Sequence, residues 1–295
     1  FTGSMMKMWA KPDDANNKWF ATIEALENFS PNIGIKVRAA AVGYFSAVED
    51  SMNSGDWSKS DAALIKIAEY QKENGAAVYP SDNKVKAELF YNKTNIFELL
   101  WPLYFLMGFI LLILSFTKIL YPKLKMDLVA KGSLGLLFVF FVGHTLGLAL
   151  RWYISGHAPW SNGFESMTYI AWATVLAGFI FSKHSPITLA ATSILAGLIL
   201  FVAHLSWMNP QVTNLVPVLN SYWLSIHVSM ITASYGFLAL GALLGFITLL
   251  LFILRTDKNE KHISLSIKEL NAVSEMSLMI GLIMLTVGNF LGGVW

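Results

Sequence analysis

Histidine is the residue type in this chain that best offers metal-ligating chemistry, because the sequence holds six histidines and no cysteine. Without cysteine, the chain has no thiolate metal site, no thiol nucleophile and no disulfide. The histidines differ in their surroundings. His184 and His262 follow lysines in short joints and are expected to be solvated, whereas His157 and His204 are expected to form structural hydrogen bonds.

His227 lies in the stretch 217–235, PVLNSYWLSIHVSMITASY, which continues without a helix breaker into the apolar segment 236–254. If one helix covers residues 223–254, it spans about 48 Å, against a hydrocarbon core of roughly 30 Å. Its first two turns then extend beyond the lipid and carry His227, one turn after Trp223. An imidazole there can ligate a haem iron or another metal, although interfacial histidines mostly just form hydrogen bonds.

His144 is predicted about midway along another apolar helix, where ionisable residues usually face the interior of a bundle. The simpler interpretation is a packed histidine that is hydrogen-bonded to a neighbouring helix. The alternative is contact with a ligand. Arg151 lies two helical turns further on the same face, and an imidazole below a guanidinium would suit a ligand with a metal centre and carboxylate arms.

The elements that position these residues are predicted to be membrane-spanning helices. The 295 residues are 55% hydrophobic with a mean hydropathy of +0.53, which is too apolar for an ordinary soluble protein. We therefore predict an all-α fold, a polytopic membrane helix bundle with six transmembrane helices. The six apolar runs are 97–120, 132–153, 167–181, 187–208, 223–254 and 273–291.

Basic residues are distributed unevenly among the joints between these runs. Nine lysines and arginines fall after the first, third and fifth runs, and the opposite joints hold only Arg151. Cytoplasmic loops carry the excess of positive charge in membrane proteins. The pattern therefore predicts that residues 1–95, His227 and the end of the chain at Trp295 lie on the outer side.

Residues 1–95 are predicted to form a separate, small helical domain outside the membrane. Eleven basic and twelve acidic residues are intermixed there, and apolar residues recur at helical spacing in 19–29, 35–48 and 62–70. We expect the membrane domain to cover 96–295. Because the sequence begins with Phe, we expect it to be a piece of a longer protein.

Two predicted outer loops, 151–166 and 208–222, are rich in aromatic residues, Asn and Pro. An aromatic belt with turn residues explains some of these aromatics. It explains Trp160, well inside a loop, less well. Loops of this kind more readily line a concave apolar site.

The same stretches carry a family resemblance. RWYISGHAPWSNGFESM at 151–167, followed by NSYWLSIHVSMITASYGFLALG at 220–241, resembles CcsA-type cytochrome c biogenesis proteins. CcsA is the membrane component of the cytochrome c haem lyase and is often fused to a ResB/CcsB-type partner. The similarity covers about 97–295. NFLGGVW at 289–295 resembles the lead-in to the family's tryptophan-rich WWD loop, so we expect the sequence to end just before it.

The resemblance implies a haem lyase component of the bacterial inner membrane, which binds haem b and attaches it to the CxxCH motif of apocytochrome c on the periplasmic side. It implies partnership with a ResB/CcsB-type protein or fused domain, residence in the lipid bilayer, and no nucleic-acid partner. His227 matches the first of two outer axial ligands and is taken as the catalytic residue; the second lies beyond the chain, so the fragment alone is expected to be inactive. The candidate cofactor-binding residues are His227, Trp223, Arg151, His144, Trp160 and Trp295.

Three alternatives remain at this point. The chain can belong to a haem exporter or other permease without ligation activity. It can be a membrane scaffold whose loops bind a partner protein. It can also be a related haem-handling protein that acts with a haem chaperone.

Overall fold

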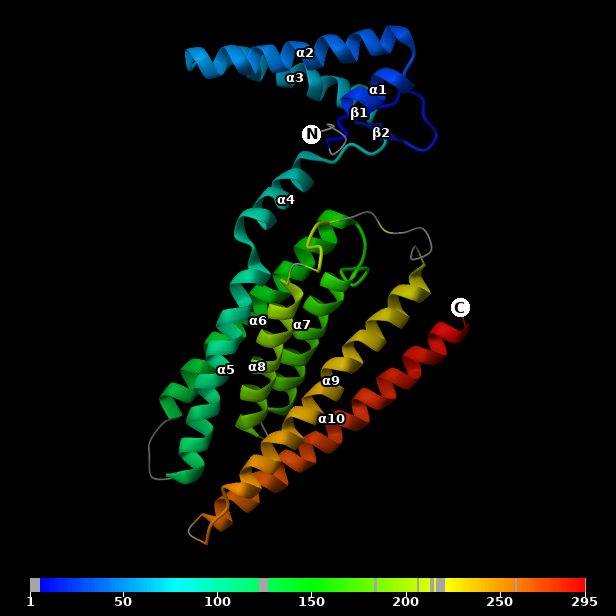
Figure 1. The fold of residues 1–295 in the computed structure, drawn as a ribbon. Helices are drawn as coiled ribbons and strands as arrows, with labels where there is room; N and C mark the ends of the chain where they lie inside the picture. Colours follow the sequence, from blue (N-terminus) through cyan, green and yellow to red (C-terminus); the bar gives the residue numbers. More distant parts are fainter. Residues whose placement is uncertain are drawn as a thin grey trace. The chain divides into compact units, whose positions relative to one another are not determined.

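The structure is a computed structural model that describes residues 6–121, 127–182, 185–205, 207–212, 215, 221–257 and 259–294 (Figure 1). It divides into two compact units, Phe1–Asp82 and Asn83–Trp295. The division lies at Asp82 and not at the expected residue 95, because helix α4 (Asp82–Thr94) belongs to the second unit. Tyr91 of α4 packs edge-to-face on Phe97 at a ring distance of 6.3 Å and lies in that unit's core. His184 and Trp295 lie outside the described residues.

The first unit is mainly helical, with a small antiparallel hairpin that the sequence analysis did not predict. Its elements are β1 (Trp9–Ala10), β2 (Trp19–Phe20), α1 (Thr22–Asn28), α2 (Pro31–Ser54) and α3 (Ser58–Asn74). Helix α2 begins with Pro31 in its first turn and ends before Gly55, whose φ of 79° favours glycine. The core gathers Trp9, Phe20, Ala25, Phe29, Val37, Ala41 and Ile67.

The second unit confirms the predicted all-α membrane bundle. After α4 it contains α5 (Ile96–Leu120), α6 (Asp127–Ser155), α7 (Gly163–Phe181), α8 (Pro186–Ala203), α9 (Tyr222–Ile253) and α10 (Glu260–Val294). Within the described residues, five helices are long and apolar enough to cross a membrane. The expected sixth, 187–208, is the shorter α8, whose last residue, Ala203, is followed by a turn at His204. The count of six is therefore not confirmed.

Helices α9 and α10 form the most closely packed pair, running side by side along their length (Figure 1). Small residues and hydroxyl groups line the contact between them. The Oγ of Ser274 donates to the Gly241 carbonyl at 3.0 Å, and the Oγ of Ser277 donates to the Phe237 carbonyl at 2.8 Å. In a membrane, close backbone approach and hydrogen bonds between helices replace the hydrophobic effect as the source of association. The packing of α9 on α10 therefore determines which residues of α10 lie against His227.

Candidate functional site

His227 lies in the second turn of α9 and contacts the last turns of α10. Its Nδ1 lies 2.6 Å from the carbonyl oxygen of Gly288. Because a carbonyl can only accept, Nδ1 carries the proton and donates it, which leaves the lone pair of a neutral ring on Nε2. Metal-binding imidazoles commonly use this arrangement, in which a backbone carbonyl fixes the tautomer and the ring orientation.

The same ring lies flat against a glycine of α10. A Cβ added at Gly292 would be 2.4 Å from Cε1 and 2.9 Å from Nε2 of His227. Gly288 and Gly292 are one turn apart, and together they make the space that the imidazole occupies. His227 is therefore half-buried in the contact between α9 and α10.

An apolar groove of about 470 Å³ lies at the same end of this helix pair. Trp223, one turn before His227, lines it together with Phe290 and Val294 of α10, and all three side chains are more than half exposed. Within the described residues, no group of three or more His, Asp or Glu side chains could hold a metal ion. The groove therefore offers an apolar surface one turn from His227, which is not among its lining residues.

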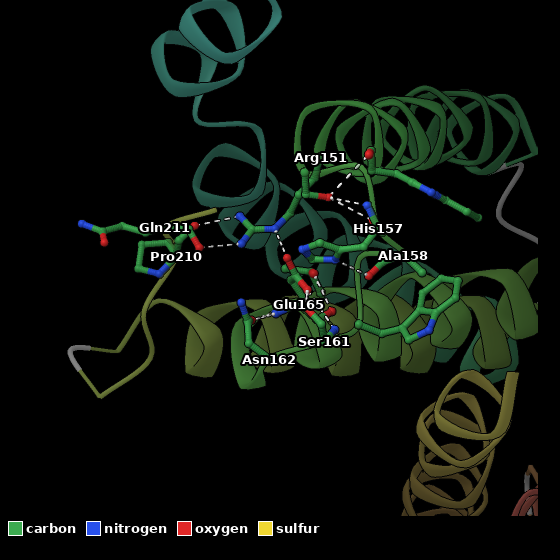
Figure 2. Close-up of polar contacts among 12 residues, drawn as sticks. Arg151, His157, Ala158, Ser161, Asn162, Glu165, Pro210 and Gln211 are labelled. Atoms are coloured by element: carbon green, nitrogen blue, oxygen red, sulfur yellow. Dashed lines mark hydrogen bonds and ion pairs between the residues drawn. The ribbon is translucent and has the colours of Figure 1, made fainter. Parts of the chain in front are cut away.

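Arg151 is fully buried at the end of α6, and four hydrogen bonds engage its guanidinium (Figure 2). Its Nε donates to Glu165 Oε1 at 2.7 Å, and its Nη1 donates to the Tyr91 hydroxyl at 3.2 Å and the Pro210 carbonyl at 2.7 Å. Its Nη2 donates to the Gln211 carbonyl at 2.9 Å. The structure therefore gives Arg151 other partners than the expected carboxylate arm of a ligand, and binding such an arm would require breaking this network.

Glu165, the acidic partner of Arg151, begins helix α7 and is also fully buried. The Oε2 of Glu165 accepts from the backbone N–H of Ser161 at 2.8 Å and from the Ser161 hydroxyl at 2.6 Å (Figure 2). The backbone N–H of Glu165 donates to the side chain of Asn162, the N-cap of α7, at 2.9 Å. The sequence analysis missed this residue. Glu165 is the single acid of the two loops, as Arg151 is their single base, and that pairing was the available signal.

Trp160 connects the loop 156–162 to α9, on a different face from His227. Its Nε1 donates to the Ser225 carbonyl at 3.0 Å, and its ring lies 4.9 Å from that of Tyr169. A cavity of about 230 Å³ lies beside it, with Ser225 and Val228 of α9 in its wall. The structure therefore brings Trp160 against the helix that carries His227, and His227 does not line the cavity beside Trp160.

His144 is completely buried, and its Nε2 donates to the Thr168 carbonyl of α7 at 3.1 Å. Phe97 and Tyr104 lie against its ring, at 5.4 and 5.9 Å between ring centroids. The structure matches the simpler interpretation, a packed histidine bonded to a neighbouring helix, and does not bring His144 to His227. The expected structural bonds are present for the other two histidines, from His157 Nδ1 to the Ala158 carbonyl and from His204 Nδ1 to the Leu200 carbonyl.

Comparison with known proteins locates the site within a family. Residues 160–295 match the family model described as Cytochrome C assembly protein. The matched residues lie within the membrane unit. Over all 295 residues the chain is 41% identical to Protein NrfI of Wolinella succinogenes, of which it covers 32%. It is 34% identical over 184 residues to the cytochrome c biogenesis protein CcsA of Parasynechococcus marenigrum, a match of 51% of this chain and 59% of the relative.

These matches confirm the resemblance to CcsA-type proteins, and the chain spans only a third to three fifths of the length of these relatives. Trp160, Glu165, Trp223 and His227 fall inside the residues that the family model covers, whereas Arg151 lies before them. The His227 contact with α10 thus lies within the residues that the family model covers.

Proposed function

We propose that this membrane unit handles haem in cytochrome c biogenesis and that His227 is an axial ligand of the haem iron. The observation that supports the proposal is the hydrogen bond between His227 Nδ1 and the Gly288 carbonyl. In a neutral ring, this bond places the proton on Nδ1 and leaves the lone pair of Nε2 available to iron. Trp223 and the apolar groove beside it would cover part of the porphyrin.

The finer reaction that we propose is attachment of haem b to the CxxCH motif of apocytochrome c by a lyase of which this chain is a part. Bound haem would supply an iron for the imidazole and two vinyl groups, to which the substrate's thiols add. The chain has no cysteine, so both thiols must belong to the substrate. The contribution of the protein is then to hold the reactants in register and to exclude water, and such positioning accounts for a large share of many catalytic accelerations.

The proposed setting is the bacterial inner membrane, with His227 and the first unit on the periplasmic side and a ResB/CcsB-type protein or domain as partner. The charge distribution supports this orientation. Lys118, Lys131, Arg255, Lys261 and Lys268 all lie near the end of the bundle opposite to His227. Cytoplasmic ends of membrane helices carry such an excess of basic residues.

The test compares His227→Ala with His262→Ala in the full-length protein that contains this chain. His262 is exposed near the start of α10, at the opposite end of the bundle, and controls for loss of an imidazole. We expect His227→Ala to lose most of the Soret absorbance per mole of purified protein and to lose maturation of a CxxCH cytochrome, while His262→Ala keeps both. Unchanged haem content in His227→Ala would contradict the ligand assignment. Retained haem without thioether formation in the parent protein would favour an exporter, and a haem-free parent would favour a scaffold.

A further inference from the structure

A second cavity lies at the end of the bundle opposite to His227, where α10 begins. Its volume is about 300 Å³, and its walls come from the last turns of α5, the start of α8, the first three turns of α10 and Ala130 of α6. Helix α10 packs along α9 and has far fewer contacts with α5 and α8. The cavity opens where the first turns of α8 and α10 meet the end of α5.

The cavity is strongly amphipathic. Its apolar wall includes Leu111 of α5, Ile187 of α8 and Leu265 of α10, and it lies against a buried cluster that contains Ile187 and Ile267. Hydroxyl groups of Ser115, Ser185 and Ser266 are interspersed with these side chains. A ligand that fits must carry a hydrocarbon part for the wall and a head rich in hydrogen-bond acceptors for the hydroxyls.

The charges at the cavity have both signs. Lys118 contributes an ammonium group from α5, His262 contributes an imidazole from the first turn of α10, and Glu269 contributes a carboxylate two turns further along α10. The start of α8, at Ser185, and the start of α10 add the positive ends of two helix dipoles to the Lys118 side. One anionic group and one cationic group on the same ligand would each find an opposite charge.

We propose that this cavity binds a zwitterionic phospholipid of the ethanolamine type, with its phosphate at Lys118 and its ammonium at Glu269. Basic pockets between membrane helices on the cytoplasmic side bind anionic lipid head groups, and Glu269 adds a carboxylate for a cationic group to this cavity. An anionic phospholipid could interact with Lys118 but would place its negative head near the Glu269 carboxylate. A dicarboxylate amphiphile such as a porphyrin would meet the same repulsion. The ethanolamine head matches both signs and leaves an acyl chain for the leucine and isoleucine wall.

The first test uses the unmodified chain. It is reconstituted in nanodiscs of equal parts phosphatidylethanolamine and phosphatidylglycerol with a trace of photoreactive phosphatidylethanolamine, and labelled peptides are mapped by mass spectrometry. We expect labelling concentrated on residues 111–119 and 262–269. Labelling spread evenly over the apolar surface would overturn the proposal. Loss of the label on addition of one equivalent of haem would also overturn it, by assigning the cavity to a porphyrin.

The second test compares variants by the class of lipid that remains bound after purification. Glu269→Gln removes the site for the ammonium, so we expect the preference for phosphatidylethanolamine over phosphatidylglycerol to fall by about two- to fivefold, the range of a partly exposed ion pair. Lys118→Ala should reduce retention of both classes. Lys268→Ala is the matched control, since it removes a lysine of α10 that does not line the cavity. Equal effects of Lys118→Ala and Lys268→Ala would show a general charge effect and overturn the site.

Discussion

Substituting Gly292 by Ala tests the His227 assignment through the space that holds the ring. The added Cβ would lie 2.4 Å from Cε1 of His227, whereas ordinary contact begins near 3.4 Å. The imidazole must therefore move by about 1 Å, which stretches its 2.6 Å bond to Gly288 beyond hydrogen-bonding distance. Losing that bond costs about 1 kcal/mol, and an off-rotamer side chain costs about another.

A combined cost of about 2 kcal/mol corresponds to a roughly 30-fold weaker affinity for haem. The assay is a titration of the full-length apoprotein with haem, followed by the Soret band. Gly293→Ala is the matched control, because a Cβ at Gly293 meets nothing within 4 Å while the gain in helix propensity is the same. If Gly292→Ala binds haem as tightly as Gly293→Ala, then either the ring position or the role of His227 as a ligand is wrong.

Three further predictions concern stability. Arg151→Met and Glu165→Leu should each lower the free energy of unfolding in detergent by about 3–5 kcal/mol, because each leaves a buried charge unpaired. The double variant should lose less stability than either single variant. Additive losses would contradict the pairing. Trp160→Phe should lower the free energy of unfolding by about 1 kcal/mol, because it removes the hydrogen bond to the Ser225 carbonyl. It should leave haem content unchanged if this loop does not face the ligand of His227. In the isolated first unit, burial raises the pKa of Tyr70 above its usual value near 10, because folding favours its neutral side chain. The contribution of Tyr70 to the free energy of unfolding should therefore be complete below pH 10 and should fall as the pH rises further. Tyr70→Phe should remove that part of the pH dependence, and unchanged Trp fluorescence would show that the variant keeps its fold.

The sequence predicted the apolar helices because a long hydrophobic run is a strong signal that needs no knowledge of partners. The predicted helix 223–254 differs from α9 by one residue at each end. Prediction was less successful where hydrophobicity is weak. Helix α8 is shorter than its apolar run, and the β1–β2 hairpin has only two residues in each strand, too few for an alternating pattern to be visible.

The site was harder to predict than the fold, because a side chain's role depends on what packs against it. The sequence shows that Arg151 lies at the end of a helix, and a ligand's carboxylate was a reasonable partner. It does not show that α7 begins by turning Glu165 inward, or that the chain returns at Pro210 with two free carbonyls. For His227, the apolar run predicted a place near the start of a long helix, but the contact with Gly292 depends on the register between α9 and α10.

That register links the fold of this unit to its proposed chemistry. The bond that fixes the tautomer of His227 comes from the backbone of α10, so turning the ring away from that helix breaks the bond. In the α9–α10 contact, glycines of one helix lie against side chains of the other, as Gly241 does against Leu278 and Gly292 against His227, so a shift of one helix displaces side chains of its partner. A haem bound at Nε2 would therefore stabilise one register of the two helices. Conversely, variants that shift the register far from the site, such as Ser277→Leu at the Phe237 carbonyl, should weaken haem binding without touching His227. Ser277→Ala, which loses the bond but not the space, should weaken it much less, and equal haem affinities in the two variants would show that the register does not control the ligand.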